Sequence, residues 1–192
     1  GVGTENFVLG TVAGAPAWIA GITKIGETIL GADATSVTFS SIPGDYQHLL
    51  LFIKARTDRA VAAGADNVAC NFNNDTGTVY SSQNVNAAAL VVSSGESVNA
   101  AEGYIAVCSG STTSVIASAG LVLIPQYAAT TFRKITIGMS CAQTLVDITA
   151  GINIRNWAVT WDSTSAISEI DLTPELGTNF VTGSAFALYG VE

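Results

Sequence analysis

Residues 36–57, SVTFSSIPGDYQHLLLFIKART, decide the fold, because they contain two β-strand patterns joined by one sharp corner. Val37 and Phe39 alternate with polar residues, which is the period of two expected of a half-buried strand. The corner at residues 42–45, IPGD, combines a proline, which cannot donate a ladder hydrogen bond, with a glycine, which allows a positive φ. These features predict a strand on each side of a tight turn.

The second of these strands begins at His48 and is predicted to lie at the centre of a sheet. Leu49, Leu51 and Ile53 share one face of a strand and are all apolar, so that face should be buried in a core. The opposite face changes from apolar to cationic as it runs toward Arg56. We expect this face to be covered at its start and to reach solvent at its end.

The rest of the chain repeats short strand-like patterns with turn residues between them and almost no helical periodicity. These patterns occur at residues 25–30, 68–72, 78–82, 104–108, 113–124, 132–141, 145–154, 157–161, 167–172 and 185–191. Many short strands of this kind are typical of two-layered antiparallel proteins. We therefore predict an all-β fold, an antiparallel β-sandwich of the jelly-roll type.

Three local features are predicted between these strands. Residues 57–67 are Ala-rich and charged, so they allow a short helix or a long loop. The turn residues 73–77, NNDTG, predict a hairpin between the strands on either side of them. Residues 83–102 are rich in Asn, Ala and Ser, and we expect a surface loop there with a small strand at 89–92.

The composition is unusually poor in charge. Of 192 residues, 48% are hydrophobic and 11% charged, whereas charged residues make up about 25% of an ordinary globular domain. Such a chain must hide apolar surface, either in a very complete core or against copies of itself. A net charge of −8 with only 7 dispersed Lys and Arg argues against nucleic-acid binding. No apolar stretch approaches the ~20 residues that span a bilayer, and we see no signal peptide.

The first 22 residues differ from the rest. Residues 1–22, GVGTENFVLGTVAGAPAWIAGI, are rich in Gly and Ala and carry a few large apolar side chains. We predict an N-terminal arm or linker, followed by a β-sandwich domain at residues 23–192. Phe7, Leu9 and Trp18 are the candidate anchors by which the arm docks on a neighbouring subunit. The chain begins with Gly rather than Met, which suggests a processed chain or the end of a longer one.

Few residues could carry catalysis or bind a metal. His48 is the only histidine, and no Gly-x-Ser-x-Gly motif accompanies it. Cys70, Cys108 and Cys141 are widely spaced and form no CxxC or CxxH motif, so we interpret them as buried apolar residues. We predict no catalytic residue, no cofactor and no metal site.

The remaining acidic candidates favour structural roles. Asp75 begins an Asp-Thr-Gly tripeptide like that of aspartic proteases, but two asparagines precede it where an apolar strand is needed, which favours a turn. Glu169 and Asp171 share one strand face, as a glycosidase pair could. No aromatic or basic residue lies beside them in the sequence, which favours a solvated face.

Two tryptophans are the candidate glycan contacts. Trp157 and Trp161 are four residues apart, so they share a face of one strand. If that face is exposed, the two indoles form a platform on which sugars can stack. If it is buried, they belong to the core, which is the interpretation we favour.

Four segments, in order along the chain, resemble a family of bacteriophage virion proteins. They are SVTFSSIPGDYQHLLL at 36–51, FNNDTGTVYSS at 72–82, WDSTSAISEIDLTP at 161–174 and NFVTGSAFALYG at 179–190. The lead-in at 3–21, GTENFVLGTVAGAPAWIAG, is similar to the Gly-Ala-Pro-Trp segment before C-terminal domains of phage tail fibres. The segment 83–130 departs most from the family pattern. Members are small β domains of tail-fibre, minor tail or decoration proteins.

The resemblance implies a non-enzymatic structural protein located in the virion and assembled in the cytoplasm of the host bacterium. We expect a homo-oligomer, most simply a homotrimer, that contacts other virion proteins. The favoured role is the distal domain of a tail fibre that attaches to host surface polysaccharide. The alternative is a head decoration protein that stabilises the capsid, and a remoter alternative is a glycan-cleaving enzyme.

Overall fold

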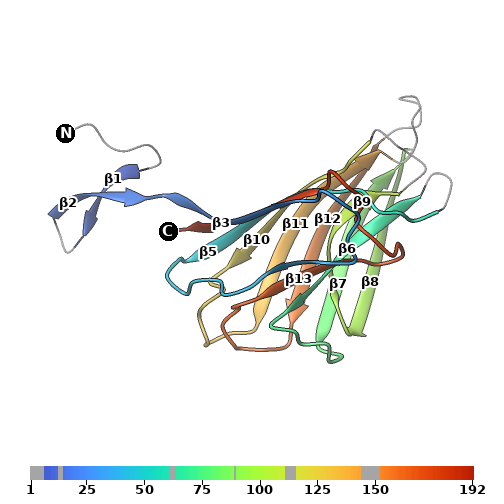
Figure 1. Cartoon of the computed structure of the whole chain (residues 1–192). Helices are drawn as coiled ribbons and strands as arrows, with labels where there is room; N and C mark the ends of the chain where they lie inside the picture. The colour runs from blue at the N-terminus through green and yellow to red at the C-terminus, as the bar shows by residue number, and fades with distance from the viewer. Residues whose placement is uncertain (1–6, 13–14, 61–63, 89, 111–115, 144–151) are drawn as a thin grey trace.

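The computed structural model describes residues 7–12, 15–60, 64–88, 90–110, 116–143 and 152–192. Within this part of the chain the regular structure is entirely β (Figure 1). The strands are β1 (Phe7–Val12), β2 (Ala15–Ala20), β3 (Ile22–Ile29), β4 (Val37–Phe39), β5 (His48–Lys54), β6 (Ala65–Phe72), β7 (Tyr80–Ala88), β8 (Val91–Ala100), β9 (Gly103–Ser109), β10 (Ala119–Pro125), β11 (Lys134–Gln143), β12 (Ile152–Trp161), β13 (Ile170–Pro174) and β14 (Ala185–Val191).

The strands of the main body form two antiparallel sheets packed face to face. The larger sheet has eight strands in the order β3-β14-β5-β10-β11-β12-β7-β8, and the smaller has four in the order β4-β13-β6-β9. Figure 1 shows the smaller sheet lying across one face of the larger. The predicted all-β antiparallel sandwich is thus confirmed. The jelly-roll assignment is not, and the division into eight and four strands is unlike the two equal sheets of an eight-stranded jelly roll.

The core lies between the sheets and includes the predicted central strand. β5 pairs with β14 on one side and β10 on the other. Leu49 and Leu51 are fully buried and Ile53 is 3% exposed, which confirms their predicted placement. The apolar set of β5 therefore faces the core, as expected for a strand that has one face on a core.

Replacing Leu51 with alanine is expected to lower the free energy of unfolding by about 2–5 kcal/mol, because burial is lost and a cavity remains. Denaturant unfolding of the purified variant measures this loss. Leu176, which is 58% exposed, provides the control. Its replacement by alanine should change stability by less than about 0.5 kcal/mol. Equal effects of the two substitutions would contradict the assignment of Leu51 to the core.

Several local predictions are corrected. The strands flanking residues 73–77 are β6 and β7, which lie in different sheets, so they do not form a hairpin. The turn connects the two layers, and Asn73 and Asn74 adopt φ angles of 54° and 56°, as its composition allows. The described part of residues 57–67 contains no helix, and β6 begins there at Ala65.

The prediction of a surface loop at residues 83–102 is also corrected, because these residues form most of a long hairpin of β7 and β8. β8 is the last strand of the larger sheet, and much of the hairpin is exposed or half-buried on both faces. Polar residues are therefore tolerated on both faces, and the alternation that marks a half-buried strand is lost. Further along, β12 runs unbroken from residue 152 to 161 where two strands were expected, and residues 145–151 lie outside the described residues.

The N-terminal arm is a separate hairpin. Among the described strands, β1 and β2 pair only with each other, and Figure 1 shows them standing away from the sandwich. The register pairs Leu9 with Trp18 and Phe7 with Ala20. β3 begins at Ile22, which pairs with Val191 of the sandwich. We therefore place the end of the arm at residue 21.

Candidate interaction surface

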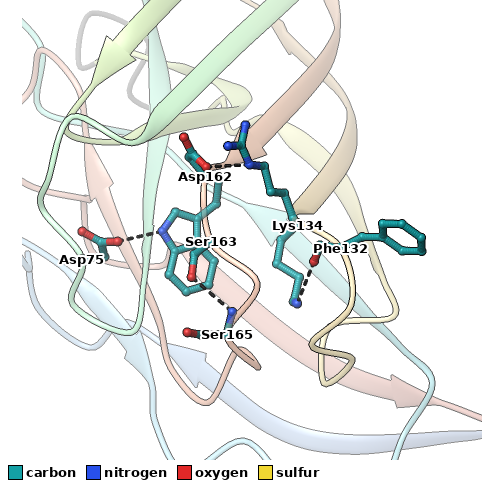
Figure 2. A network of polar contacts seen from close by, with 8 residues as sticks. Asp75, Phe132, Lys134, Asp162, Ser163 and Ser165 are labelled. Atoms are coloured by element: carbon teal, nitrogen blue, oxygen red, sulfur yellow. Dashed lines mark hydrogen bonds and ion pairs between the residues drawn. The ribbon is translucent and has the colours of Figure 1, made fainter.

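The residues that could have suggested catalysis serve as structural contacts. Nδ1 of His48 accepts a hydrogen bond from the backbone N–H of Gln126, at 3.2 Å. Asp75 accepts one from the Nε1–H of Trp161 at 2.9 Å and another from the backbone N–H of Gly77 at 3.0 Å. Figure 2 shows the Asp75 carboxylate directed at this indole nitrogen. Asp75 thereby stabilises the turn between the sheets and accepts the hydrogen bond that the buried Trp161 indole N–H needs.

The same end of the sandwich carries a wider network of polar contacts (Figure 2). Asp162 forms an ion pair with Arg133, with an Nε–Oδ1 distance of 2.6 Å. The ammonium of Lys134 donates to backbone carbonyls, among them those of Thr164 at 3.2 Å and Phe132 at 3.5 Å. Burial lowers the pKa of Lys134. These contacts close the connections at this end of β11 and β12, and each polar group in them already has a partner.

The two candidate glycan contacts lie in the interior. Trp157 is 4% exposed and Trp161 is 2% exposed, so neither indole offers a face to a sugar. The Trp161 ring packs on Phe72 with centroids 5.6 Å apart, and the Trp157 ring packs on Tyr104 at 6.1 Å. The assignment of these residues as glycan contacts is therefore corrected, whereas the core placement favoured from the sequence agrees with their burial.

Glu169 and Asp171, considered as a glycosidase pair, also make structural contacts; Asp171 lies on β13, and Glu169 lies just before it. Asp171 accepts a hydrogen bond from the hydroxyl of Thr38, and Glu169 accepts one from the side-chain amide of Asn74. Both contacts tie β13 and its approach to neighbouring segments.

A second acidic pair, which sequence reasoning missed, lies beside Tyr104. Burial, and then the charge of Glu175, raises the pKa of Glu102. The Tyr104 side chain interacts with both carboxylates, and Glu175 also accepts a hydrogen bond from Asn67 at 2.7 Å. A glycosidase pair must flank a space for the scissile bond. Here both carboxylates interact with the Tyr104 side chain.

The three cysteines are unpaired, and two of them are buried. Burial raises the pKa of the thiols of Cys70 and Cys108, which opposes formation of a reactive thiolate. Cys141 is partly exposed. Over the described residues, no cluster of His, Cys, Asp and Glu has the arrangement to hold a metal ion.

The outer face of the eight-stranded sheet, which is turned away from the smaller sheet, exposes many large apolar side chains. Directly paired residues of neighbouring strands lie on the same face. One row across this face is Phe52, Leu121, Met139, Asn156 and Val85, from β5, β10, β11, β12 and β7 in turn. The strand register thus places large apolar residues side by side across the middle of the sheet.

A second row lies beside the first and is also mainly apolar. It consists of Leu50, Leu123, Ile137, Ala158 and Gln83. We name the outer surface of β5, β10, β11, β12 and β7 the outer apolar face.

Its large side chains are exposed to solvent in the single chain. Ile137 is 53% exposed, Met139 57%, Ile154 52% and Phe52 46%. Monomeric soluble proteins rarely expose contiguous apolar patches of more than a few hundred Å². The outer apolar face is therefore the surface at which an interaction is expected.

Sequence reasoning missed this surface, although β11 carries the signal for it. In KITIGMSCAQ, the apolar set Ile135, Ile137 and Met139 faces outward, and the inward set is Lys134, Thr136, Gly138, Ser140 and Ala142. The inward residues are mostly small because β9 crosses close above them: the hydroxyl of Ser140 accepts a hydrogen bond from the N–H of Val107 at 2.9 Å. β11 thus turns its larger apolar side away from its own core.

Comparisons with protein-family models, with curated proteins and with solved structures found no match for this chain. The described residues include no helix that could span a bilayer.

Proposed function

We propose that this chain is a non-enzymatic structural protein of a bacteriophage virion and works as a homo-oligomer, with a trimer favoured. Its favoured position is the distal end of a tail fibre or similar appendage, where it contacts host surface polysaccharide. The observation that carries the proposal is the outer apolar face, a broad sheet surface without a partner in the single chain. The resemblance of four ordered segments to virion β domains supplies the virion context.

Competition with the intact phage tests the position of the chain in the virion. Added in excess, the purified chain should occupy host receptors and reduce adsorption of the phage to its host cells. Labelled chain should also bind extracted host surface polysaccharide. A chain that binds neither cells nor polysaccharide would contradict the distal-appendage role.

The non-enzymatic assignment predicts no glycan-cleaving or peptide-cleaving turnover. The acidic residues considered as catalysts are engaged with neighbouring groups, as Asp75 is with Trp161 and Glu102 with Tyr104. Incubation with host polysaccharide and with unfolded protein, followed by analysis of released fragments, measures any turnover. A reproducible activity that disappears in Asp75→Asn, Glu169→Gln or Glu102→Gln would establish an enzyme instead.

A head decoration protein is the second candidate, and the hairpin of β1 and β2 favours it. An arm that stands away from its own sandwich (Figure 1) can reach an adjacent capsid subunit. In this role the chain should bind capsids that lack it and leave adsorption to host cells unchanged. Binding to such capsids and competition for adsorption to host cells therefore separate the two candidates.

Either role predicts that the arm strengthens assembly. Deleting residues 1–21 should weaken association of the chains, because apolar area that neighbouring subunits would bury, at about 25 cal/mol per Å², is removed. The sandwich should stay folded, because β3 keeps its pairing with β14. Sedimentation velocity measures association, and circular dichroism checks the fold. Unchanged association after the deletion would show that the arm is not an assembly element.

A further inference from the structure

We infer that the outer apolar face packs against the same face of neighbouring copies of this chain, so that the eight-stranded sheets meet around the symmetry axis of the oligomer. This inference rests on the proposed function in one respect, that the chain is a homo-oligomer. It adds the surface through which the copies meet and the strands that form it.

The pattern of β11 is the first reason. Within a strand, the apolar set normally faces the core, because burial of apolar area is the main driving force for folding. In β11 this set is Ile135, Ile137 and Met139, and all three are more than half exposed. This alternation is expected of a strand whose outward apolar side chains are buried by a surface that does not belong to the same chain.

The distribution of charge is the second reason, and it identifies the partner. Residues of β10, β11, β12 and β7 place no charged side chain on the outer apolar face. Lys24 and Glu27 lie on the edge strand β3, Glu96 lies on the edge strand β8, and Lys54 lies at the end of β5. A charged partner would leave its own charges buried without counter-ions. The complementary surface must be apolar and uncharged, as the same face of a second copy is.

The net charge points the same way. Each chain carries a net charge of −8, so two copies repel each other wherever acidic surfaces meet. The middle of the outer apolar face is a broad surface through which they can approach without that repulsion. Depletion of charged residues at the centre, with charges at the rim, is also the composition of the core of a stable interface.

The area of the face is the third reason. Five strands about 4.8 Å apart, each 7–10 residues long at about 3.3 Å per residue, cover about 550–800 Å². That area is close to the roughly 800 Å² that each partner contributes to a standard-size protein interface. The face is therefore large enough to hold copies together without a contribution from another protein.

Cys141 provides a reporter for burial of this face. It lies on the outer side of β11, where it pairs with Ile154 of β12 and Ala119 of β10. Cys70 and Cys108 are buried in the core, so maleimide should modify only Cys141 in a folded single chain. In the oligomer that we infer, Cys141 is covered and should react slowly.

Ile137→Glu places a carboxylate in the middle of the face, and Ile154→Glu places one nearer its end, on the adjacent strand. Leaving a charge unpaired in an interface should weaken association about 100-fold or more. Leu176→Glu is the matched control, because Leu176 is 58% exposed and lies on a loop outside the eight-stranded sheet. It makes the same chemical change and should leave association as it is. Circular dichroism of each variant confirms that it folds.

The experiment combines sedimentation velocity with maleimide labelling of the full chain, up to about 100 µM, where an interface of micromolar affinity is saturated. We expect an oligomer with Cys141 protected at least about 10-fold for the wild type and for Leu176→Glu, and monomers with reactive Cys141 for the two face variants. An oligomer in which Cys141 reacts at the monomer rate, or which persists in a folded face variant, overturns the face assignment and leaves the proposed homo-oligomer standing. A wild-type chain that stays monomeric overturns both. Labelling of the wild type as a function of concentration decides the matter even if a face variant fails to fold.

Discussion

Replacing Gly138 with alanine is expected to destabilise the chain by about 3 kcal/mol or more, a large share of the stability of an ordinary domain. A Cβ atom at this position would lie 2.1 Å from the backbone oxygen of Ile105 on β9. That carbonyl cannot easily move, because β9 is held by its pairing with β6 and by the bond from the N–H of Val107 to Ser140. The two sheets would therefore have to separate locally.

Gly120→Ala is the matched control, since Gly120 lies on the neighbouring strand and faces the same core. A Cβ atom there would meet the Cβ atoms of Ala106 and Ile53 at 3.4 Å, which is ordinary contact. The change in stability should be below about 1 kcal/mol, and alanine could even stabilise the strand. Urea unfolding of the two variants measures the difference. Similar midpoints for both would show that β9 does not lie as close to β11 as we describe.

Replacing Asp66 with alanine is the second substitution with a large expected effect, a loss of about 3–5 kcal/mol. The side chain is 1% exposed and accepts four hydrogen bonds. The hydroxyl of Thr57 donates at 2.8 Å, and the backbone N–H groups of Asn67, Leu176 and Gly177 donate at 2.8, 3.0 and 2.9 Å. Alanine would leave these donors without an acceptor and would release the loop between β13 and β14.

Asp171→Ala provides the comparison for Asp66. Asp171 accepts an exposed hydrogen bond from Thr38, and removing such a contact should cost less than about 1 kcal/mol. Thermal unfolding of both variants gives the two losses. If Asp66→Ala unfolds at the temperature of Asp171→Ala, the buried carboxylate is not the anchor of this loop.

The positions of most strands could be predicted from the sequence, because alternation is a local property. β5 shows this most clearly, with Leu49, Leu51 and Ile53 buried as expected. Pairing was harder to predict, since the turn at 73–77 has hairpin composition but connects different sheets. Turn chemistry fixes the local change of direction and leaves open which strand the chain joins next.

The functional surface could be predicted only in outline. The low charge content indicated that the chain hides apolar surface, yet it gave no location for it. The outer apolar face is assembled from β5, β10, β11, β12 and β7, which come together only through the sheet order. The tryptophans of β12 illustrate the same limit, because Trp157 packs on Tyr104 of β9, which belongs to the other sheet. Asp66 could not be recognised either, since most of its partners are backbone groups.

The central claim, that this chain assembles with its own copies as part of a virion, is tested most directly by electron cryomicroscopy of the intact phage particle. We predict that the sandwich fits density repeated around a symmetry axis at the end of an appendage, with the eight-stranded sheets of adjacent copies facing one another. A particle in which the chain is absent, or in which its density is an isolated single copy with the outer apolar face open to solvent, would contradict the account.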